Sequence, residues 1–383
     1  MTFDYHEACG WLARSTGYKR PYDRKNRPLD GLVPAYWQDI CRELGEPRSA
    51  YRLVKVAGSK GKGITATLIA AALQAGGNSV GLTTSPHLVD QRERMVIDGE
   101  MVSEKEFAAA IERVAHAASE ESDARTYFGA VMCGALTAFA KAAVDVCVAE
   151  CGMGGANDAT GFLKADVTVL TGVELEHTRQ LGNDLESIAY EKAMAAAEMT
   201  PIVIPSLPNE AMEGVHRAAR EKRLDIVRLK TADMDARSVC EALAKIACGL
   251  SQMPFDASGL SEVPVPCRDD ERVFGSSRVL FDGAHTPQSL ARIGRRYGDG
   301  SRFLLFSCTP GRDSEVLARA LGNGWSKAYY AGPAETPPGF EKIATDSSVS
   351  LIRQGGDFVV TGSFHFAGEV MSMLGIRPFR QRS

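Results

Sequence analysis

Short apolar runs alternate with helical patterns along most of the chain from Leu53 onward. Five runs of strand length are expected in the first part of the chain: Leu53–Ala57, Ser79–Thr83, Val144–Glu150, Asp166–Thr171 and Pro201–Pro205. Such alternation is typical of βαβ units, whose parallel sheet is buried on both faces. Gly76 and Gly77 follow the helical pattern between the first two runs and predict where that helix ends.

The alternation stops between Ser251 and Glu271, where Pro, Ser and acidic residues are frequent. This composition predicts a linker between domains. Four further strands are expected beyond it, at Arg278–Phe281, Phe303–Ser307, Ala328–Ala331 and Phe358–Thr361. The pattern therefore predicts two α/β domains, the second of them smaller, as suits a chain of 383 residues.

Composition narrows the class of protein further. The net charge is −4 and the pI is about 6.0, so a general attraction to nucleic acid or to an anionic membrane is not expected. The nine cysteines are scattered without zinc-ligand spacing, which favours reduced thiols. The polar N-terminus shows no signal peptide, and the longest apolar stretch is too short to span a bilayer. We expect a cytoplasmic protein whose basic run at 17–28 is a solvated loop rather than an anion-binding flap.

A glycine-rich loop follows the first expected strand, in the sequence KVAGSKGKGIT. Its spacing is not that of a Walker loop, because only Ser59 and Lys60 separate Gly58 from the Gly-Lys pair, and the first hydroxyl after that pair is Thr65. The position between a strand and a helix nevertheless favours a phosphate loop over an ordinary turn. Backbone N–H groups would approach the phosphate oxygens, and Lys62 would add a positive charge near the β- and γ-phosphates.

Four later segments lie at or beyond the carboxyl ends of expected strands: TSPHLVDQRER, AECGMGGANDAT, ELEHTRQLGNDLESIAYEKA and LFDGAHTP. Open α/β sheets bind their ligands at that edge. Ser85, Glu150 and His177 would bring a hydroxyl, a carboxylate and an imidazole there. Each has an ordinary explanation by itself, as a turn residue, a core acid or a loop histidine. Together they form a plausible ligand set for a hard cation.

These segments, together with KVAGSKGKG and VVTGSFHFAGEV, resemble the motif series of the folylpolyglutamate synthase/dihydrofolate synthase family, a branch of the Mur ligase superfamily. The resemblance runs from about Tyr5 to Gly375. It implies an α/β fold with a Mur-ligase-type P-loop ATPase domain at 1–258, built on a largely parallel sheet. A smaller Rossmann-like α/β ligase domain is expected at 259–383.

The resemblance also implies the reaction and its ligands. ATP and Mg²⁺ would drive amide formation between a small-molecule carboxylate and glutamate through an acyl phosphate, in a monomer without nucleic-acid or membrane partners. Folate glutamylation or dihydrofolate synthesis is the leading assignment. Charge on the triphosphate and on the carboxylate must be brought together, which demands cations and oriented backbone dipoles.

The resemblance assigns individual residues to these tasks. It implies nucleotide contacts from Gly58, Ser59, Lys60, Gly61, Lys62, Gly63, Ile64, Asp235, Arg268 and Asp282. It implies Mg²⁺ ligation by Ser85, Glu150 and His177. Catalytic roles are implied for Lys62, Lys192 and His285, of which Lys192 matches a lysine that the family carbamylates.

Several positions depart from the family pattern. Ile64 stands where the family has a metal-binding Ser, Gly129 replaces an acidic residue, Ala156 replaces an Arg and Thr286 replaces an Asn. We expect Ile64 to be buried and Thr65 to point away from the phosphate, since residues one apart on a helix diverge by about 100°. Water would then complete the Mg²⁺ shell.

Two alternatives stay open. The first is a ligase of the same family that joins an amino acid to a non-folate carboxylic acid. The second is a catalytically degenerate, nucleotide-binding Mur-like partner subunit, which Ile64 and Gly129 favour and the retained metal set opposes. A P-loop kinase or GTPase is less well supported, because the loop spacing is wrong and no NKxD motif occurs.

Overall fold

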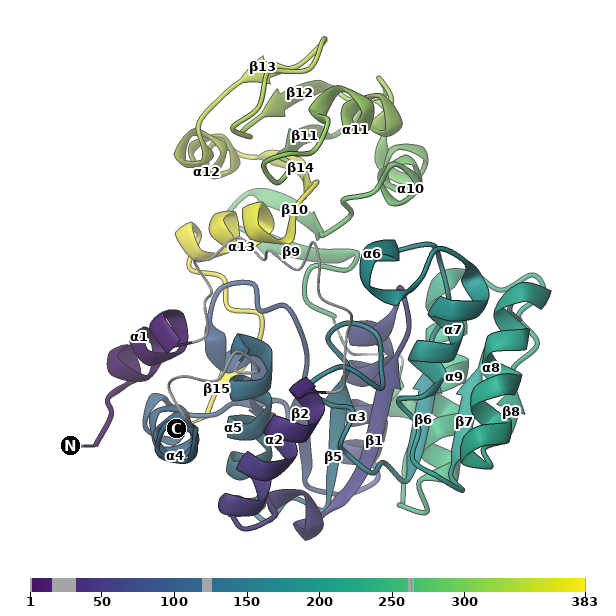
Figure 1. The fold of residues 1–383 in the computed structure, drawn as a ribbon. Helices are drawn as coiled ribbons and strands as arrows, with labels where there is room; N and C mark the ends of the chain where they lie inside the picture. Colours follow the sequence, from purple (N-terminus) through teal and green to yellow (C-terminus); the bar gives the residue numbers. More distant parts are fainter. Residues whose placement is uncertain (1, 16–31, 119–125, 261–262, 264, 383) are drawn as a thin grey trace. The chain divides into compact units, whose positions relative to one another are not determined.

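The computed structural model describes residues 2–15, 32–118, 126–260, 263 and 265–382, so the basic run at 17–28 lies outside the described residues. The chain forms two compact units (Figure 1). Unit 1 comprises Met1–Ser85, Gln91–Val263 and Arg380–Ser383, and unit 2 comprises Pro86–Asp90 and Pro264–Phe379. Within the described ranges, no helix is both long and apolar enough to cross a membrane. All nine cysteines are free thiols, as expected.

Unit 1 is built on a largely parallel sheet, which has nine strands within the described residues, in the order β15-β4-β3-β2-β5-β1-β6-β7-β8. The strands are β1 (Arg52–Ala57), β2 (Val80–Thr83), β3 (Val96–Ile97), β4 (Glu100–Met101), β5 (Val146–Glu150), β6 (Val167–Leu170), β7 (Pro201–Ile204), β8 (Asp225–Arg228) and β15 (Arg380–Gln381). From β2 to β8 every pair is parallel, whereas β3 runs antiparallel to both of its neighbours. The five predicted strands are confirmed, and the largely parallel sheet follows from their apolar runs.

Helices cover both faces of this sheet (Figure 1). They are α1 (Tyr5–Ser15), α2 (Leu32–Glu43), α3 (Lys62–Ala75), α4 (Glu104–Ala117), α5 (Tyr127–Lys141), α6 (Thr178–Leu181), α7 (Leu185–Ala193), α8 (Asn209–Lys222) and α9 (Ala236–Leu250), with the 3-10 turns η1 (Pro47–Ala50), η2 (Gln91–Arg94) and η3 (Ala257–Leu260). Helices α3 and α9 pack against each other. Helix α3 also packs against β1, β2 and β5, and α9 packs against β6 and β7. Leu53 and Cys147 join a core cluster with α1, α4 and α5, whereas Leu170 and Ile204 join one with α7 and α8.

Unit 2 is a smaller α/β unit whose sheet has the order β13-β12-β11-β14-β10-β9. Its strands are β9 (Asp270–Phe274), β10 (Ser277–Asp282), β11 (Phe303–Phe306), β12 (Lys327–Tyr330), β13 (Glu341–Lys342) and β14 (Gly356–Thr361), and its helices are α10 (Pro287–Tyr297), α11 (Ser314–Leu321), α12 (Thr345–Gln354) and α13 (Phe364–Met373). Only β9 runs antiparallel to its neighbour among these pairs. Val279 and Phe281 face the cluster that contains α12 and α13, and Leu280 faces the one that contains α10 and α11. This alternation buries both faces of the sheet, as predicted.

A tryptophan occupies the space beside Gly129 on α5. A Cβ atom added to Gly129 would lie 2.0 Å from Nε1 of Trp37, which is a fully buried residue on α2. Nε1 finds no hydrogen-bond partner among the described residues. The acidic side chain expected from the family pattern therefore has no room here, because the indole ring fills its place.

We expect Gly129→Ala to lower the free energy of unfolding by about 2 kcal/mol or more, because the rigid indole cannot yield without a shift of helices. Urea-induced unfolding of the variant and the parent protein measures this difference in the free energy of unfolding. The matched control is Gly134→Ala on the same helix, where a Cβ would meet only Ile111 Cδ1 and Met95 Cε, both at 2.8 Å. Those methyl groups end flexible side chains, and helix propensity favours Ala by up to about 1 kcal/mol. Equal losses in the two variants would contradict the proposed clash.

Candidate active site

The loop between β1 and α3 presents the start of a helix at the carboxyl edge of the unit 1 sheet. Gly58 has φ 140° and Gly61 has φ 82°, both in the left-handed region that favours glycine. A Cβ on Gly58 would lie 2.1 Å from Oγ1 of Thr171, so the close approach of these two segments also requires glycine. Lys62 begins α3 and donates from Nζ to the Gly58 carbonyl at 3.0 Å. The first N–H groups of a helix have no intrahelical acceptor, so this helix start is suited to an anion.

The two residues after Gly63 differ in burial. Ile64, which we expected to be buried, is only half-buried, because this first turn of α3 lies at the edge of the sheet. Thr65 is fully buried, and its Oγ1 has no hydrogen-bond partner in the described part of the chain. The Thr65 hydroxyl is therefore shielded inside the domain.

A buried carboxylate lies beside this loop. Glu150 ends β5, which pairs with β1 in the register Val56↔Glu150. Its Oε2 accepts a hydrogen bond from the Ser85 backbone N–H at 2.7 Å. A Cβ on Gly63 would be 3.5 Å from the same oxygen. The structure thus brings Ser85, Glu150 and the loop together, and oxygen donors of this kind suit Mg²⁺.

Lys192 reaches the loop from α7. Its ammonium group is almost fully buried and donates to Glu176 Oε1 at 2.8 Å and to the Gly58 carbonyl at 3.1 Å. Burial lowers the pKa of Lys192, whereas the Glu176 carboxylate acts in the opposite direction. Lys192, predicted from the sequence alone, therefore lies next to the phosphate loop.

His177 lies at the exposed edge of this group of side chains, directly before α6, with φ 46°. Partial desolvation lowers the pKa of His177, and the charges of Lys192 and Lys62 lower it further against the effect of Glu176. A neutral imidazole is the form that binds metals. In the described ranges, no three His, Cys, Asp or Glu side chains are grouped to hold a metal ion. The predicted set contains only two such residues, and the Ser85 hydroxyl would be its third ligand.

A cavity of about 260 Å³ adjoins the loop on the side of β6 and β7. Its lining runs from Ser59 and Lys60 of the loop to Thr171–Glu174, Pro205–Pro208, Thr231 and Val239. Asp235 lies one turn before Val239, where its Oδ1 caps α9 by accepting from the Ser238 N–H at 2.8 Å. The Lys60 side chain pairs with Glu174 at 2.7 Å. Sequence reasoning singled out the segment that begins at Glu174 but gave no role to residues 171–173 or 205–208, although these too follow strand ends, where ligands are expected.

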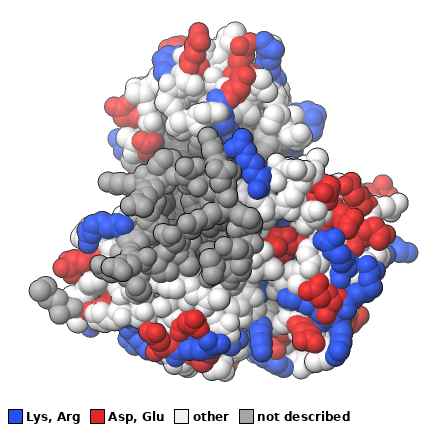
Figure 2. All heavy atoms as spheres, in the orientation of Figure 1, with Lys and Arg blue, Asp and Glu red and all other residues white. Residues whose placement is uncertain are grey.

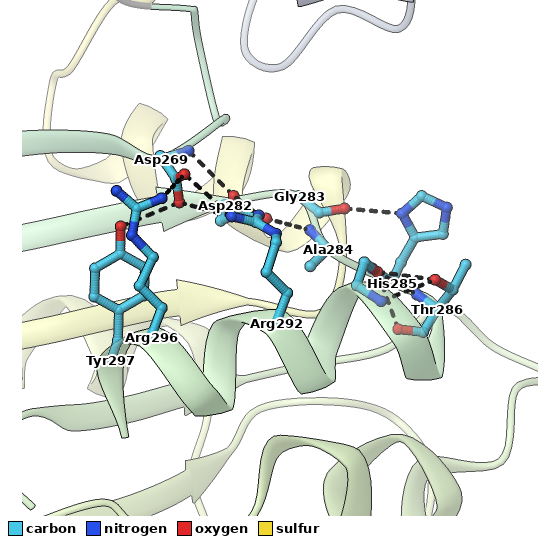
Figure 3. A network of polar contacts seen from close by, with 10 residues as sticks. Asp269, Asp282, Gly283, Ala284, His285, Thr286, Arg292, Arg296 and Tyr297 are labelled. Atoms are coloured by element: carbon cyan, nitrogen blue, oxygen red, sulfur yellow. Dashed lines mark hydrogen bonds and ion pairs between the residues drawn. The ribbon is translucent and has the colours of Figure 1, made fainter. Parts of the chain in front are cut away.

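Asp282 and His285 lie at the end of β10 in unit 2 (Figure 3), and Arg268 belongs to the same unit. Asp282 is buried, and its Oδ2 accepts from Arg292 Nη2 at 2.8 Å and from the Asp269 N–H at 3.1 Å. Its Oδ1 accepts from the Ala284 N–H at 2.8 Å. Both carboxylate oxygens are therefore engaged in holding the turn after β10, although a nucleotide contact was expected of Asp282.

Two other residues of unit 2 carry predicted roles. His285 follows the turn after β10, and its Nδ1 lies 2.8 Å from the Gly283 carbonyl (Figure 3). The Arg268 guanidinium lies over the Phe364 ring, 4.2 Å from its centre. The first contact orients the imidazole and the second fixes the guanidinium plane.

The sheet topology and the loop after β1 define a nucleotide-binding α/β protein of the Mur ligase type. No protein-family model matches the chain. It is 28% identical over 385 residues to the dihydrofolate synthase/folylpolyglutamate synthase of Escherichia coli, covering 88% of this chain and 90% of that protein. It is 34% identical over 312 residues to the enzyme of the same name from Buchnera aphidicola, covering 74% of each. The chain belongs to the dihydrofolate synthase/folylpolyglutamate synthase family.

A solved structure agrees with this relationship. The chain superimposes on E. coli FolC in complex with ADP, determined without folate substrate, with a TM-score of 0.78 and 25% identity. The match covers 96% of this chain and 97% of that one. The predicted fold class and the expected family are both confirmed.

Proposed function

We propose that this protein is an ATP- and Mg²⁺-dependent ligase that joins glutamate to a small-molecule carboxylate, with dihydropteroate or a reduced folate as the acceptor. The observation that carries the proposal is the position of Glu150, a buried carboxylate beside Gly63 and Ser85 at the start of α3. Once the loop holds the phosphates, this carboxylate would face a second negative charge, and a cation between the two would remove the repulsion. The names of the related enzymes support the choice of acceptor.

The reaction would proceed in two displacements. An oxygen of the acceptor carboxylate attacks the γ-phosphorus of ATP, ADP leaves, and an acyl phosphate forms. The amine nitrogen of glutamate then attacks the acyl carbon, inorganic phosphate leaves with the bonding electron pair, and the nitrogen loses a proton. Lys62 and the N–H groups of the loop would bind the phosphates throughout.

Ser85, Glu150 and His177 fit a hard cation by their donor atoms and would hold Mg²⁺ together with water. The metal would supply charge neutralisation between the triphosphate and the acceptor carboxylate. Lys192 is the proposed carbamylation site, because burial favours the neutral amine that reacts with carbon dioxide. The cavity beside Ser59 and Lys60 would receive the base of the nucleotide, with Asp235 near its rim.

In this proposal, residues 1–258 form the ATP-binding domain and residues 259–383 form the ligase domain, to which Arg268, Asp282 and His285 contribute. A monomer in the cytoplasm, without nucleic-acid or membrane partners, is part of the same proposal. The absence of polyanionic partners is supported by Figure 2, in which the Lys and Arg residues described on that face lie among Asp and Glu. Interspersed charges of this kind do not form an extended basic field.

An acceptor screen tests the proposal. We expect dihydropteroate or a reduced folate to stimulate ADP release only when ATP, Mg²⁺ and glutamate are all present. Only the amine of glutamate consumes the acyl phosphate. The rate of ADP release should therefore stay near the background when either the acceptor or glutamate is omitted. Coupled detection of ADP measures the rate, and the Lys62→Ala protein provides the background.

The same screen separates the alternatives. Clear stimulation by a non-pterin carboxylate, with none by any pterin, would replace the acceptor assignment. Gly129 favours this outcome, because the family pattern has an acidic residue at this position and the Trp37 indole leaves no room for one here. Saturable ATP binding without ADP release for any acceptor would identify a degenerate partner subunit.

A further inference from the structure

A second cavity of unit 1, of about 250 Å³, lies between α4, α5 and the residue that follows β15. None of the residues that line it belongs to the phosphate loop or to the predicted site. Its lining contains both apolar side chains and charged side chains. It is slightly below the usual volume of small-molecule sites, about 300–1,000 Å³.

The charged side chains leave an excess of positive charge. Arg113, Lys141 and Arg382 line the cavity together with one carboxylate, that of Glu106. Glu106 Oε2 already accepts from the backbone N–H and the hydroxyl of Ser103, each at 2.8 Å, in the capping box of α4. The carboxylate is therefore committed to its helix start, and the three cations are not matched by three anions.

The electrostatics of Glu106 show that two of these cations act at the same place. Burial raises the pKa of Glu106, but the hydrogen bonds from Ser103 and the charges of Arg382 and Lys141 outweigh it, so this pKa lies below its ordinary value. Lys141, the last residue of α5, and Arg382, which follows β15, line the same cavity as this carboxylate. An anion placed there would interact with both.

The side chain of Arg382 has a buried donor without a hydrogen-bond acceptor among the described residues. Strand β15 pairs with β4 in parallel, and the Arg382 N–H continues this pairing by donating to the Met101 carbonyl at 3.0 Å. The side chain is thereby held against the cavity. Its Nη1 atom is shielded from solvent, yet in the described part of the chain it finds no hydrogen-bond acceptor. A shielded cationic donor without an acceptor is costly, and an anion would remove that cost.

The remaining lining residues are mostly small and apolar, which favours a ligand with an apolar body. Ala109 and Ala110 of α4 line the cavity together with Ala138 of α5 and Ala142, which directly follows α5. Thr137 also lines it, but its hydroxyl donates to the Cys133 carbonyl at 2.8 Å. Small methyl groups provide a wall that an apolar body can cover and that a bare inorganic anion cannot use.

We propose that this cavity is a binding site for a small organic carboxylate, whose anionic group meets Lys141 and Arg382 and whose apolar body lies on the alanine wall. The site is separate from the phosphate loop and does not depend on the proposed function. Since Arg382 directly follows β15, the bound carboxylate would also fix the last segment of the chain to α5.

Calorimetric titration of the whole protein with benzoate tests the proposal. We expect one saturable site, with an affinity at least about tenfold higher than that for benzamide, a neutral molecule of the same shape. Lys141→Ala and Arg382→Ala should each weaken benzoate binding by about tenfold. Lys105→Ala is the matched control, because Lys105 is an exposed residue of α4 outside the lining, and it should leave the affinity unchanged.

Two further arms separate this site from other causes of binding. Benzoate affinity should be unaltered by saturating ADP with Mg²⁺, and Ala109→Leu should abolish binding by filling the cavity while the melting temperature confirms folding. Lys141→Ala and Arg382→Ala add no volume to the cavity, so they provide a test even if Ala109→Leu does not fold. Absence of saturable binding, equal affinity for benzamide or for inorganic phosphate, or unchanged affinity in both charge variants would each overturn the proposal.

Discussion

Lys62→Ala should lose at least about 100-fold in ATP turnover, because it removes the positive charge next to the transferring phosphate. The side chain is half-buried and contacts the Gly58 and Ser59 carbonyls of its own loop, so little packing is lost with it. The rate of ADP release under saturating substrates measures the effect. Circular dichroism and thermal melting check that the fold is intact.

Lys245→Ala is the matched control, because Lys245 is an exposed lysine of α9 that belongs neither to the loop nor to the lining of the cavity beside it. Exposed charges contribute little, so we expect a change in turnover of less than about threefold. Near-normal turnover in Lys62→Ala, or an equal loss in both variants, would remove the assignment of Lys62 to the phosphate.

Ile64→Ser should lower the Mg²⁺ concentration needed for half-maximal turnover by about 10- to 100-fold, the range for one ligand or its direct support. Ile64 is half-buried in the first turn of α3, directly after Gly63, whose Cβ position faces Glu150. A serine there would place a hydroxyl near the proposed metal ligands. A Mg²⁺ titration of ATP turnover measures the change.

Thr65→Val tests whether water or the Thr65 hydroxyl replaces the serine that the family has as a metal ligand. Thr65 is fully buried, and its Oγ1 makes no hydrogen bond with the described residues, so an isosteric methyl should leave the Mg²⁺ requirement unchanged. Removing an unsatisfied buried hydroxyl should also raise stability slightly. A steep rise in the Mg²⁺ requirement of Thr65→Val, without improvement in Ile64→Ser, would instead assign the ligand to Thr65.

The fold was largely predictable because its main strands are continuous apolar runs. The runs at Leu53–Ala57 and Val144–Glu150 are buried on both faces, and this leaves a clear signal in one sequence. Strands β3, β4 and β15 have two residues each, too few to show a period. Strand β8 lies at the sheet edge with exposed ends, so its sequence DIVR carries little apolar pattern.

The candidate site was predictable in its parts but not in its contacts. Lys192 and Gly58 are far apart in sequence, and only the packing of α7 brings the ammonium to the loop carbonyl. The same holds for the indole of Trp37 beside Gly129. The expected burial of Ile64 is wrong, because the first turn of a helix at a sheet edge stays partly open to solvent. The roles of these residues remain predictions.

The division of the chain also has a consequence for biosynthesis. Leu88 and Val89 pack with the core of unit 2, although they are synthesised long before the rest of that unit. Strand β15 adds to the edge of the unit 1 sheet, although the residues directly before it, Pro264–Phe379, belong to unit 2. Unit 1 therefore cannot be complete on a nascent chain before all of unit 2 has been synthesised, and a single proteolytic cut between the units would release neither of them whole. We infer that a fragment that lacks either Pro86–Asp90 or β15 leaves one of the two units without part of its fold.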